Sequence, residues 1–377
     1  MRALTAAVAL ALLTPLVPVA AAQGALSNQG FGYPTGQLSG AARGAGGATV
    51  ETDPNSPINP AAVTQSSRYS VLMQFEPEFR RTAIGGSAAT AKIPRFPQFS
   101  ASGAFRRFAY AASVSTFLDR SWENAYADSV LVDGQWTEST VHTRSNGAIG
   151  DARLALGYVV HRRLQVGVGL HAFSGENRVS FLRTFPDTSG ITGVAQASSV
   201  TYVGRALSLG LVARPLDGVV VGVSTRVGGR LGADQAGGSV GGDASVPSRT
   251  GIGISWLALP GASLNARFDR TKWTEMDALG SADVVTFDAD EIGLGVDVLG
   301  PAFGGVNSIV RLGAKSRTLP FGVNGDQVSE LAFSTGLGVP VARGRAQLDF
   351  ALERAGRRAA GGTERGWFIS VGLGIRP

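Results

Sequence analysis

The sequence contains no cysteine and only three histidines among its 377 residues. Without thiols the chain forms no disulfides, and chemistry based on cysteine is excluded. His142, His161 and His171 do not follow a metal-binding spacing such as His-x-x-x-His. We therefore predict no metal and no cofactor, and we interpret each histidine as a residue that faces water or lies at a rim.

Charged residues are also scarce, at 16% of the chain, against ~25% in ordinary soluble proteins. The 34 basic and 28 acidic side chains are interleaved rather than clustered, which gives nucleic-acid binding little support. Ser139 lies near His142, but no third polar residue can be named to complete a hydrolase site. We therefore expect neither nucleic-acid binding nor enzymatic activity.

Long apolar runs are absent except near the start of the chain. Met1-Arg2 precedes an apolar stretch over Ala3–Leu13, and Ala20-Ala21-Ala22 follows, a pattern typical of a secretory signal peptide over residues 1–22. The stretch is too short for a transmembrane helix, which must cross ~30 Å of hydrocarbon. We expect export through this cleaved signal peptide and a mature chain over residues 23–377.

The remaining apolar residues alternate with small or polar ones. In the last such segment, Trp367, Ile369, Val371, Leu373 and Ile375 fall on one face, and glycine, serine and arginine share the other with Phe368. This period of two is typical of a β-strand. Several predicted strands place glycine on the inner face, which leaves room for something between the walls of a closed sheet.

The pattern predicts fourteen strands, and connections between them alternate between short and long. Long polar connections, such as 120–145 and 174–196, are expected outside the cell, and short turns in the periplasm. A sheet with open edges in lipid would leave backbone groups unpaired. We therefore predict an all-β protein: an antiparallel transmembrane β-barrel in the outer membrane of a Gram-negative-type bacterium. The expected strands are 68–79, 97–105, 107–119, 146–160, 163–174, 197–213, 218–230, 248–259, 262–273, 285–299, 306–317, 328–340, 343–354 and 365–376. Twelve strands remain an alternative, because the segment 97–105 has the weakest pattern.

The segment 23–67 precedes the barrel, 68–377, and shows neither strand nor helix periodicity. It is rich in glycine, alanine, proline, asparagine and serine. We interpret it as a plug inside the lumen, with a flexible periplasmic tail as the alternative. The stretch Gly40–Gly47 is not a phosphate-binding loop, because it lacks the Gly-Lys-Ser/Thr ending.

Some of these residues resemble a known family. Gly40–Ala48, Asp53 and the segment Ile58-Asn59-Pro60-Ala61-Ala62 are similar to the start of FadL-type long-chain fatty-acid transporters, as are Leu264–Met276 and Arg311–Arg317 with the residues that follow. The resemblance implies a 14-stranded barrel whose N-terminal hatch carries the motif Asn59, Pro60 and Ala61. It also implies that hydrophobic ligands leave sideways through an opening caused by a kinked strand. The chain ends in Arg376-Pro377 rather than in an aromatic residue, which departs from the usual barrel-assembly signal.

We therefore expect passive transport of long-chain fatty acids or other hydrophobic small molecules, with no nucleotide. A scaffold barrel for surface or secretion proteins and a general porin are the alternatives. Asp269, Asp297, Asp349, Glu353 and four arginines are expected on inner faces, as stiffening ion pairs. Of these arginines, Arg267, Arg311 and Arg345 are candidates to bind a carboxylate; the fourth is Arg376. Trp256, Trp273 and Trp367 are expected at the membrane interfaces. Expected partners are the hydrophobic ligand, membrane lipid, lipopolysaccharide and the barrel-assembly machinery.

Overall fold

The computed structural model describes residues 26–27, 30–66, 69–84, 87–235, 241–279, 285–303, 305–323, 325–359 and 362–376. Within these ranges, no helix has the length and apolar character needed to cross a membrane. The expected signal peptide, residues 1–22, lies outside the described residues.

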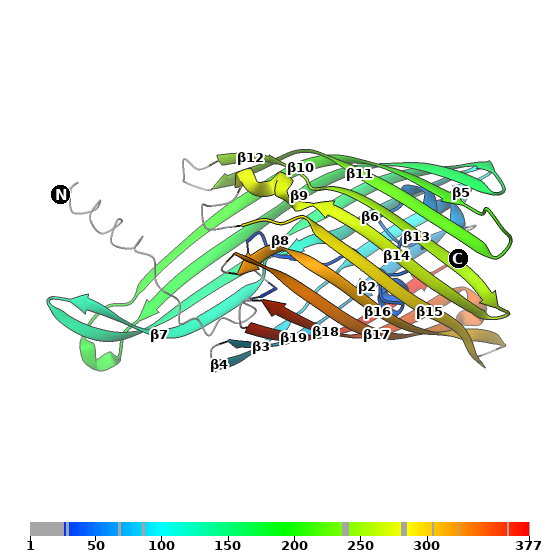
Figure 1. Ribbon diagram of the computed structural model, residues 1–377. Coiled ribbons are helices and arrows are strands. Elements are labelled where there is room, and N and C mark those ends of the chain that lie inside the picture. The colour runs from blue at the N-terminus through cyan, green and yellow to red at the C-terminus, as the bar shows by residue number, and fades with distance from the viewer. Residues whose placement is uncertain are drawn as a thin grey trace.

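The described strands form one antiparallel sheet that closes on itself (Figure 1). Closure occurs where β19 pairs with β2 and β3. The strands are β1 (Tyr33–Pro34), β2 (Ser70–Phe75), β3 (Glu78–Ile84), β4 (Ser87–Ile93), β5 (Gln98–Phe105), β6 (Phe108–Asp119), β7 (Trp122–Val132), β8 (Gln135–His161), β9 (Leu164–Thr184), β10 (Val194–Ala213), β11 (Val219–Gln235), β12 (Gly241–Ser245), β13 (Ser248–Leu259), β14 (Ala262–Lys272), β15 (Ala289–Phe303), β16 (Val306–Val323), β17 (Asp326–Val341), β18 (Ala346–Ala359) and β19 (Gly362–Ile375). The short helices are α2 (Gly40–Gly44), η1 (Pro60–Gln65), η2 (Asp187–Ser189), η3 (Trp273–Leu279) and η4 (Ala342–Gly344).

The barrel wall has fourteen strands in the described part of the chain, which confirms the predicted number over the alternative of twelve. β1 belongs to the N-terminal segment inside the barrel. Four pairs of segments continue one another along the wall: β2 with β3, β4 with β5, β6 with β7, and β12 with β13. Each pair therefore counts as one wall strand with an interruption.

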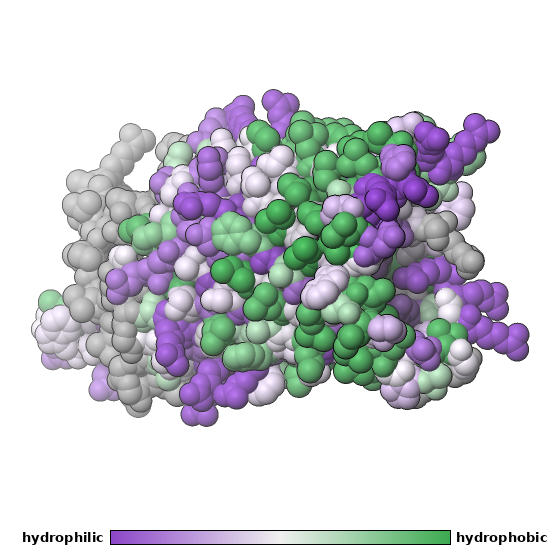
Figure 2. All heavy atoms as spheres, turned by 45° about the vertical axis from the view of Figure 1, so that its right-hand side comes forward, coloured by the Kyte–Doolittle hydropathy of each residue, from purple (hydrophilic) through white to green (hydrophobic). Residues whose placement is uncertain are grey.

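The distribution of side chains is the reverse of that in a soluble protein. Along β19 the outward Trp367 and Ile369 are each 42% exposed, whereas the inward Ser370 is fully buried. The inward charged residues Glu353 and Arg357 are also fully buried. Figure 2 shows the outward apolar side chains as a hydrophobic band with hydrophilic residues on both sides. Such a band is the surface that a transmembrane barrel presents to lipid.

The two ends of the barrel differ in their connections. Tight turns join β5 to β6 and β8 to β9 at the end where β2 begins and β19 ends. Outer-membrane barrels have short turns on the periplasmic side, so this end is assigned to the periplasm. The opposite end, where β7 and β8 form a projecting hairpin (Figure 1), is assigned to the outside.

The prediction of long external loops was wrong in part, because much of their length is strand. The segment 120–145 contains β7 and the first part of β8, and β9 and β10 extend into 174–196. Here the chain leaves the hydrophobic band, so the alternation of apolar residues that marks a strand in lipid is lost. The backbone ladder nevertheless continues, with β8 paired to β9 as far as Thr140 and Thr184.

Candidate functional site: a plugged lumen and an opening in the wall

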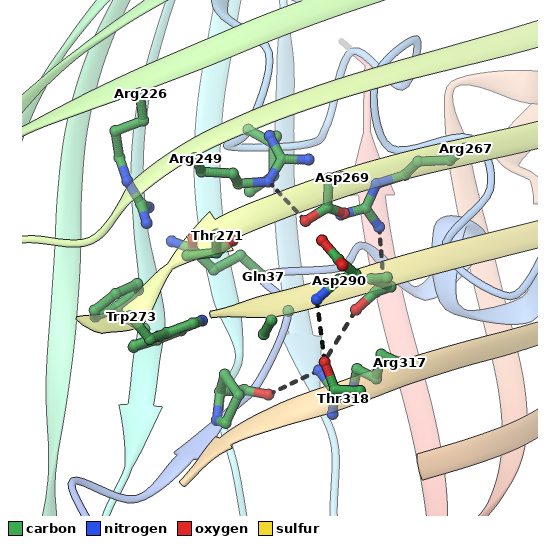
Figure 3. Close-up of a pocket in the computed structure, with 16 residues that line it drawn as sticks. Gln37, Arg226, Arg249, Arg267, Asp269, Thr271, Trp273, Asp290, Arg317 and Thr318 are labelled. Carbon is green, nitrogen blue, oxygen red and sulfur yellow. Dashed lines mark hydrogen bonds and ion pairs between the residues drawn. The ribbon is translucent and has the colours of Figure 1, made fainter. Parts of the chain in front are cut away.

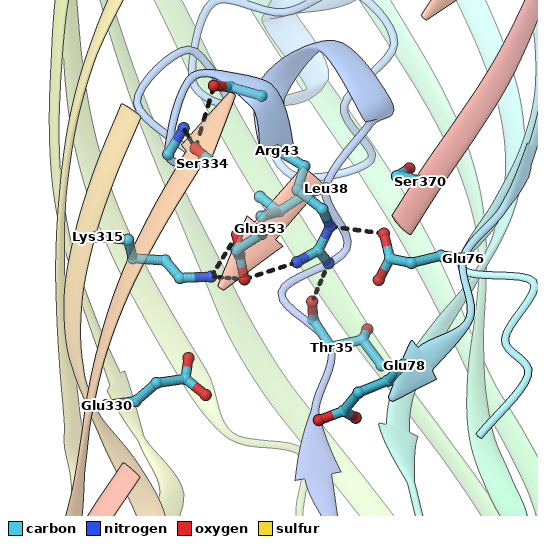
Figure 4. Close-up of polar contacts among 12 residues, drawn as sticks. Thr35, Leu38, Arg43, Glu76, Glu78, Lys315, Glu330, Ser334, Glu353 and Ser370 are labelled. Atoms are coloured by element: carbon cyan, nitrogen blue, oxygen red, sulfur yellow. Dashed lines mark hydrogen bonds and ion pairs between the residues drawn. The ribbon is translucent and has the colours of Figure 1, made fainter. Parts of the chain in front are cut away.

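A buried network at mid-barrel holds the N-terminal segment in place; we call its described residues, 26–27 and 30–66, the plug. Arg43, in the last turn of α2, lies 2.6 Å from Glu76 and 3.0 Å from Glu353 through its guanidinium nitrogens (Figure 4). Lys315 reaches the same Glu353 at 3.2 Å. These charges are almost fully buried, and a buried charge requires a partner. The network therefore ties the plug to the wall from two sides.

Glycines let the plug approach the wall closely. A Cβ atom on Gly44 would lie 2.8 Å from the Cα of Gly336, and one on Gly336 would lie 2.9 Å from the Cα of Gly44. A Cβ atom on Gly313 would overlap the backbone nitrogen of Gly46. The inner-face glycines thus leave the room that the sequence indicated, and the plug backbone occupies it.

The predicted hatch motif lies nearer the periplasmic end, at the start of η1. Asn59 is fully buried, and its Oδ1 accepts a hydrogen bond of 2.9 Å from the amide of Ala61. Its Nδ2 donates to the carbonyls of Glu51 at 2.8 Å and Leu211 at 3.2 Å. Pro60 occupies the first helical position, where no amide donor is needed. Asn59 therefore caps the helix and also fastens the plug to β10.

We expect Asn59→Ala to loosen this end of the plug. The change removes the helix cap, a loss of ~1 kcal/mol, and the bond to Leu211 of the wall. Limited proteolysis of the folded barrel should then cut residues 30–66 several times faster. Asn55→Ala is the matched control, because no side-chain hydrogen bond of Asn55 is described. Equal cleavage rates for both variants and the parent protein would show that Asn59 is not an anchor.

Tyr33 of β1 lies at the centre of a second charged cluster. Its hydroxyl donates to Glu330 at 3.1 Å and accepts from Arg317 at 2.5 Å. The guanidinium of Arg357 stacks over its ring, 4.6 Å from the centroid. Burial raises the pKa of Tyr33, so the phenol stays neutral and keeps its proton for Glu330. The cluster fixes β1 against the inside of the wall.

The wall itself is interrupted beside β1. β5 pairs with the first part of β6, but no described wall strand pairs with β4 on its second edge. At the same level β1 pairs from inside with Leu118 and Asp119 of β6. A hollow of about 430 Å³ remains, and residues of β4, β7 and β8, among them Lys92, Trp122 and Asn146, line it. The hollow lies where pairing between wall strands is missing, and we call this break in the wall the lateral opening.

An arginine spans the inner side of this opening. Arg95 lies in the link between β4 and β5, and its Nε is 2.5 Å from Asp119 of β6. Its Nη1 is 2.6 Å from Glu78 of β3. All three side chains are buried. Arg95 therefore connects the two edges of the opening and, together with β1, keeps it closed.

A small cavity of about 60 Å³ lies between the plug and the wall (Figure 3). It has room for a few water molecules only, whereas ligand pockets usually measure ~300–1,000 Å³. Arginines 226, 249, 267 and 317 line it, together with Phe117 and Trp273. The described conformation is therefore closed, and a larger ligand must displace side chains or part of the plug.

Arg226 differs from the other three cavity arginines in its pairing. Arg249, Arg267 and Arg317 each have a carboxylate within 4.0 Å, whereas the described residues provide none for Arg226. Its Nε and Nη2 both donate to the carbonyl of Pro247, at 3.2 and 3.1 Å. Figure 3 shows its guanidinium pointing toward Thr271 and Trp273. An unpaired buried cation is costly, so this position favours an anionic group.

Apolar side chains surround the unpaired arginine on the outer side of the cavity. The Arg226 guanidinium lies 5.0 Å from the ring centroid of Phe117 and 5.6 Å from that of Phe173. Phe117 in turn stacks on Trp273 at 5.2 Å. The whole buried group, which we call the aromatic cluster, comprises Phe31, Phe117, Leu118, Ile149, Phe173, Tyr202, Leu231, Val246, Trp273, Met276 and Phe321. Two of its members, Phe117 and Leu118, lie near the end of β6, and Ser121, just beyond that strand, lines the lateral opening.

Solved structures share this architecture, whereas no known sequence-family model and no curated sequence matches the chain. A Pseudomonas aeruginosa FadL homologue matches with a TM-score of 0.60 and 14% identity, over 92% of this chain and 99% of that one. The Ralstonia pickettii toluene transporter TbuX matches at 0.59 and 14%, over 90% and 98%. The Pseudomonas putida toluene transporter TodX matches at 0.58 and 13%, over 92% and 99%. The chain has the FadL-type fold. The resemblance found in the sequence is thus confirmed at the level of fold.

Within the FadL-type fold, two of the three candidate carboxylate-binding arginines face the lumen. Arg267 is buried and paired with Asp269 and, at 2.8 Å, with Glu291. Arg311 is buried and lies 2.9 Å from Asp349. Both cations are already neutralised by the wall, which is the stiffening role expected for inward ion pairs. A role in ligand binding stays a prediction for them.

The positions expected for Arg345, Arg376 and Trp273 were wrong. Arg345 is exposed in the turn after η4. Arg376 is exposed just after β19 and borders a hollow with plug residues at the periplasmic mouth, so neither arginine is buried inside the lumen. Arg345 precedes β18 and Arg376 follows β19, so both lie outside the regular strands in which side chains alternate. Trp256 and Trp367 face outward as expected, but Trp273 is only 4% exposed. It begins η3, which folds back over the lumen and carries the indole into the aromatic cluster.

His171 was predicted to face water or lie at a rim, but it is buried. Its Nδ1 lies 2.9 Å from Asp151 and its Nε2 lies 2.9 Å from Ser208. These residues belong to neighbouring strands β8, β9 and β10, so sequence spacing did not bring them together. Gln37 of the plug donates to the same Asp151 at 2.9 Å. Because a plug residue shares Asp151 with His171, we interpret the chain of bonds as a plug-to-wall contact. His142 and His161 are exposed, as predicted.

Sequence reasoning missed the residues that shape the opening and the cavity. Arg226 lies in the predicted strand 218–230, in phase with the inward Ser224, so its alternation was a usable signal. For Arg95 the signal was weaker: Pro94 and Pro97 flank it and lack the amide donors of a regular strand. Its partners, Glu78 and Asp119, are revealed only by the fold.

Proposed function

We propose that this chain is a passive outer-membrane transporter for long-chain fatty acids or other hydrophobic small molecules, exported by a signal peptide over residues 1–22. The observation that carries the proposal is the lateral opening next to the aromatic cluster. A water-filled channel has no use for an exit into lipid, whereas a hydrophobic molecule does. The solved structures that share the fold include two toluene transporters and a FadL homologue, which supports the same class of cargo.

The route we propose avoids the periplasmic half of the plug. A ligand enters from outside and inserts among the side chains of the aromatic cluster. This insertion displaces β1 from β6. Displacement of Tyr33 and rupture of the Arg95–Asp119 pair then free the opening. The ligand passes between β4 and β7 into the membrane. Asn59, Pro60 and Ala61 hold η1 in place meanwhile, so water and ions stay excluded from the lumen.

Arg226 favours a ligand with an acidic head and an apolar tail. Its free guanidinium donors suit a carboxylate, and charge-assisted hydrogen bonds are among the stronger ones. The aromatic cluster offers the tail an apolar environment, at ~0.8 kcal/mol per buried CH₂. The tail thus supplies most of the affinity, and the arginine sets the orientation.

Uptake by intact cells tests the proposal. A strain lacking the gene should take up labelled long-chain fatty acids and toluene more slowly than a strain carrying it on a plasmid. Uptake of a small hydrophilic sugar should be the same in both strains. If none of several hydrophobic compounds depends on the gene, the transport proposal fails, and co-purification of a stoichiometric protein partner would then favour a scaffold barrel.

A general porin is disfavoured by the plug. Its described residues are largely buried, and the cavity beside them holds a few water molecules only. In a planar bilayer we therefore expect no large steady conductance. Membrane lipid, lipopolysaccharide and the barrel-assembly machinery complete the proposed partners.

A further inference from the structure

Four arginines gather on the outer face of the barrel, on three neighbouring strands. Arg81 of β3 is directly opposite Arg365 of β19. Arg365 is opposite Gly356 of β18, and Arg354 and Arg358 lie on either side of that glycine along the same strand. All four side chains are exposed. We call them the arginine patch.

No acidic side chain of the described residues lies within ion-pair distance of the arginine patch. Glu330 borders the same hollow, but it is buried and paired inward with Arg317 and Arg357. The outward Arg270 of β14, by contrast, has Asp288 at 3.7 Å and Asp290 at 3.9 Å. None of the four patch arginines takes part in a described ion pair. Like charges directly opposite in a sheet, as in Arg81 and Arg365, are destabilising. The patch is therefore a surface that an anion from outside the chain would stabilise.

The position of the patch along the barrel is well defined. Outward residues of β19 change from Arg365 to the apolar Trp367 and Ile369 in one step toward the periplasm, and Arg354 stacks over Trp367 at 5.4 Å. The patch thus lies at the outer boundary of the hydrophobic band. Lipid phosphates lie at this level, just above the acyl chains.

The surface between the arginines is hollow. Gly356 has no side chain, and a Cβ atom there would meet only the carbonyl of Leu331, at 3.9 Å. The hollow measures about 440 Å³, and Leu331 and Phe333 lie beneath its basic edge. A phosphate group fits among the guanidinium groups, which bind phosphate in a bidentate manner. Acyl chains attached to it would run down over Leu331 and Phe333.

We propose that the arginine patch binds the phosphorylated glycolipid of the outer leaflet, lipid A. Two features favour lipid A over a phospholipid of the inner leaflet. The patch lies at the end of the barrel assigned to the outside, and its several cations suit a headgroup with more than one phosphate. The inference is independent of the transport function and holds for any cargo.

Native mass spectrometry of the full chain in detergent tests the site. The probes are bisphosphorylated lipid A, its dephosphorylated form and phosphatidylglycerol. The parent protein should bind one bisphosphorylated lipid A at least tenfold more tightly than either other lipid. Arg354→Gln/Arg358→Gln/Arg365→Gln should weaken that binding at least tenfold, and Gly356→Leu, which fills the hollow without a charge change, should weaken it as well.

The control removes three exposed arginines at the periplasmic end: Arg107→Gln/Arg162→Gln/Arg343→Gln. It should bind lipid A like the parent protein. Circular dichroism and heat-dependent gel mobility confirm that each barrel is folded. Equal losses in the two triple variants, or equal binding of phosphatidylglycerol, would overturn the proposal.

Discussion

Arg226→Gln should weaken the binding of a long-chain fatty acid at least tenfold and leave the binding of its methyl ester unchanged. Arg226 is the cavity arginine for which the described residues provide no carboxylate. A hydrogen bond to a charged group contributes ~1.5–3 kcal/mol, which corresponds to roughly a 10- to 150-fold change in affinity. The methyl ester has no negative charge, so it cannot gain from the arginine. Fluorescence titration of the purified barrel with both ligands measures the difference.

Arg120→Gln is the matched control for this prediction. Arg120 also stacks on rings of the aromatic cluster, 5.7 Å from the centroid of Phe31 and 5.2 Å from that of Tyr202. It does not line the cavity, so its loss should change fatty-acid affinity less than twofold. If Arg120→Gln reduces affinity for the acid and Arg226→Gln does not, the assignment of the carboxylate site is wrong.

Ala91→Trp should reduce uptake of hydrophobic compounds at least tenfold. Ala91 of β4 lines the lateral opening together with Ser121 and Trp122. An indole at this position fills the opening and leaves the plug contacts at mid-barrel unchanged. A ligand that must leave sideways is then trapped, so binding to the purified barrel should persist while uptake by cells falls.

The control is Ala152→Trp, a change of the same size on the lipid-facing side of β8. It lies in an apolar surface groove away from the opening, and uptake should stay near that of the parent protein. Normal uptake by the Ala91→Trp variant would mean that the cargo leaves through the periplasmic end, past η1 and Asn59.

The wall was predictable because lipid imposes one rule on every strand that crosses it. Residues such as Ile369 and Leu373 must be apolar and their neighbours must fit the lumen, so alternation marks each strand in the sequence. The same rule explains the failures. Beyond the hydrophobic band β8 and β9 continue as paired strands in water, where no alternation is required, and the sequence indicated loops.

The interior was less predictable, because its contacts join residues far apart along the chain. Glu353 meets Arg43, and His171 meets Asp151 and Ser208 across adjacent strands. Local patterns identified inward arginines such as Arg267 but not which of them lack a partner. The segment 97–105 had the weakest strand pattern. In the structure this wall strand is interrupted between β4 and β5, where Pro94 and Pro97 lie, and β4 borders the opening.

Photolabelling with a long-chain fatty acid that carries a photoreactive group at its tail tests the proposed route most directly. After irradiation of the folded barrel, mass spectrometry of its peptides should place the label on the aromatic cluster, around Phe117 and Phe173, and on the edges of the opening near Ala91. Excess unlabelled fatty acid should abolish this labelling. Label that resists competition, or that collects around η1 at the periplasmic end, would contradict a lateral route.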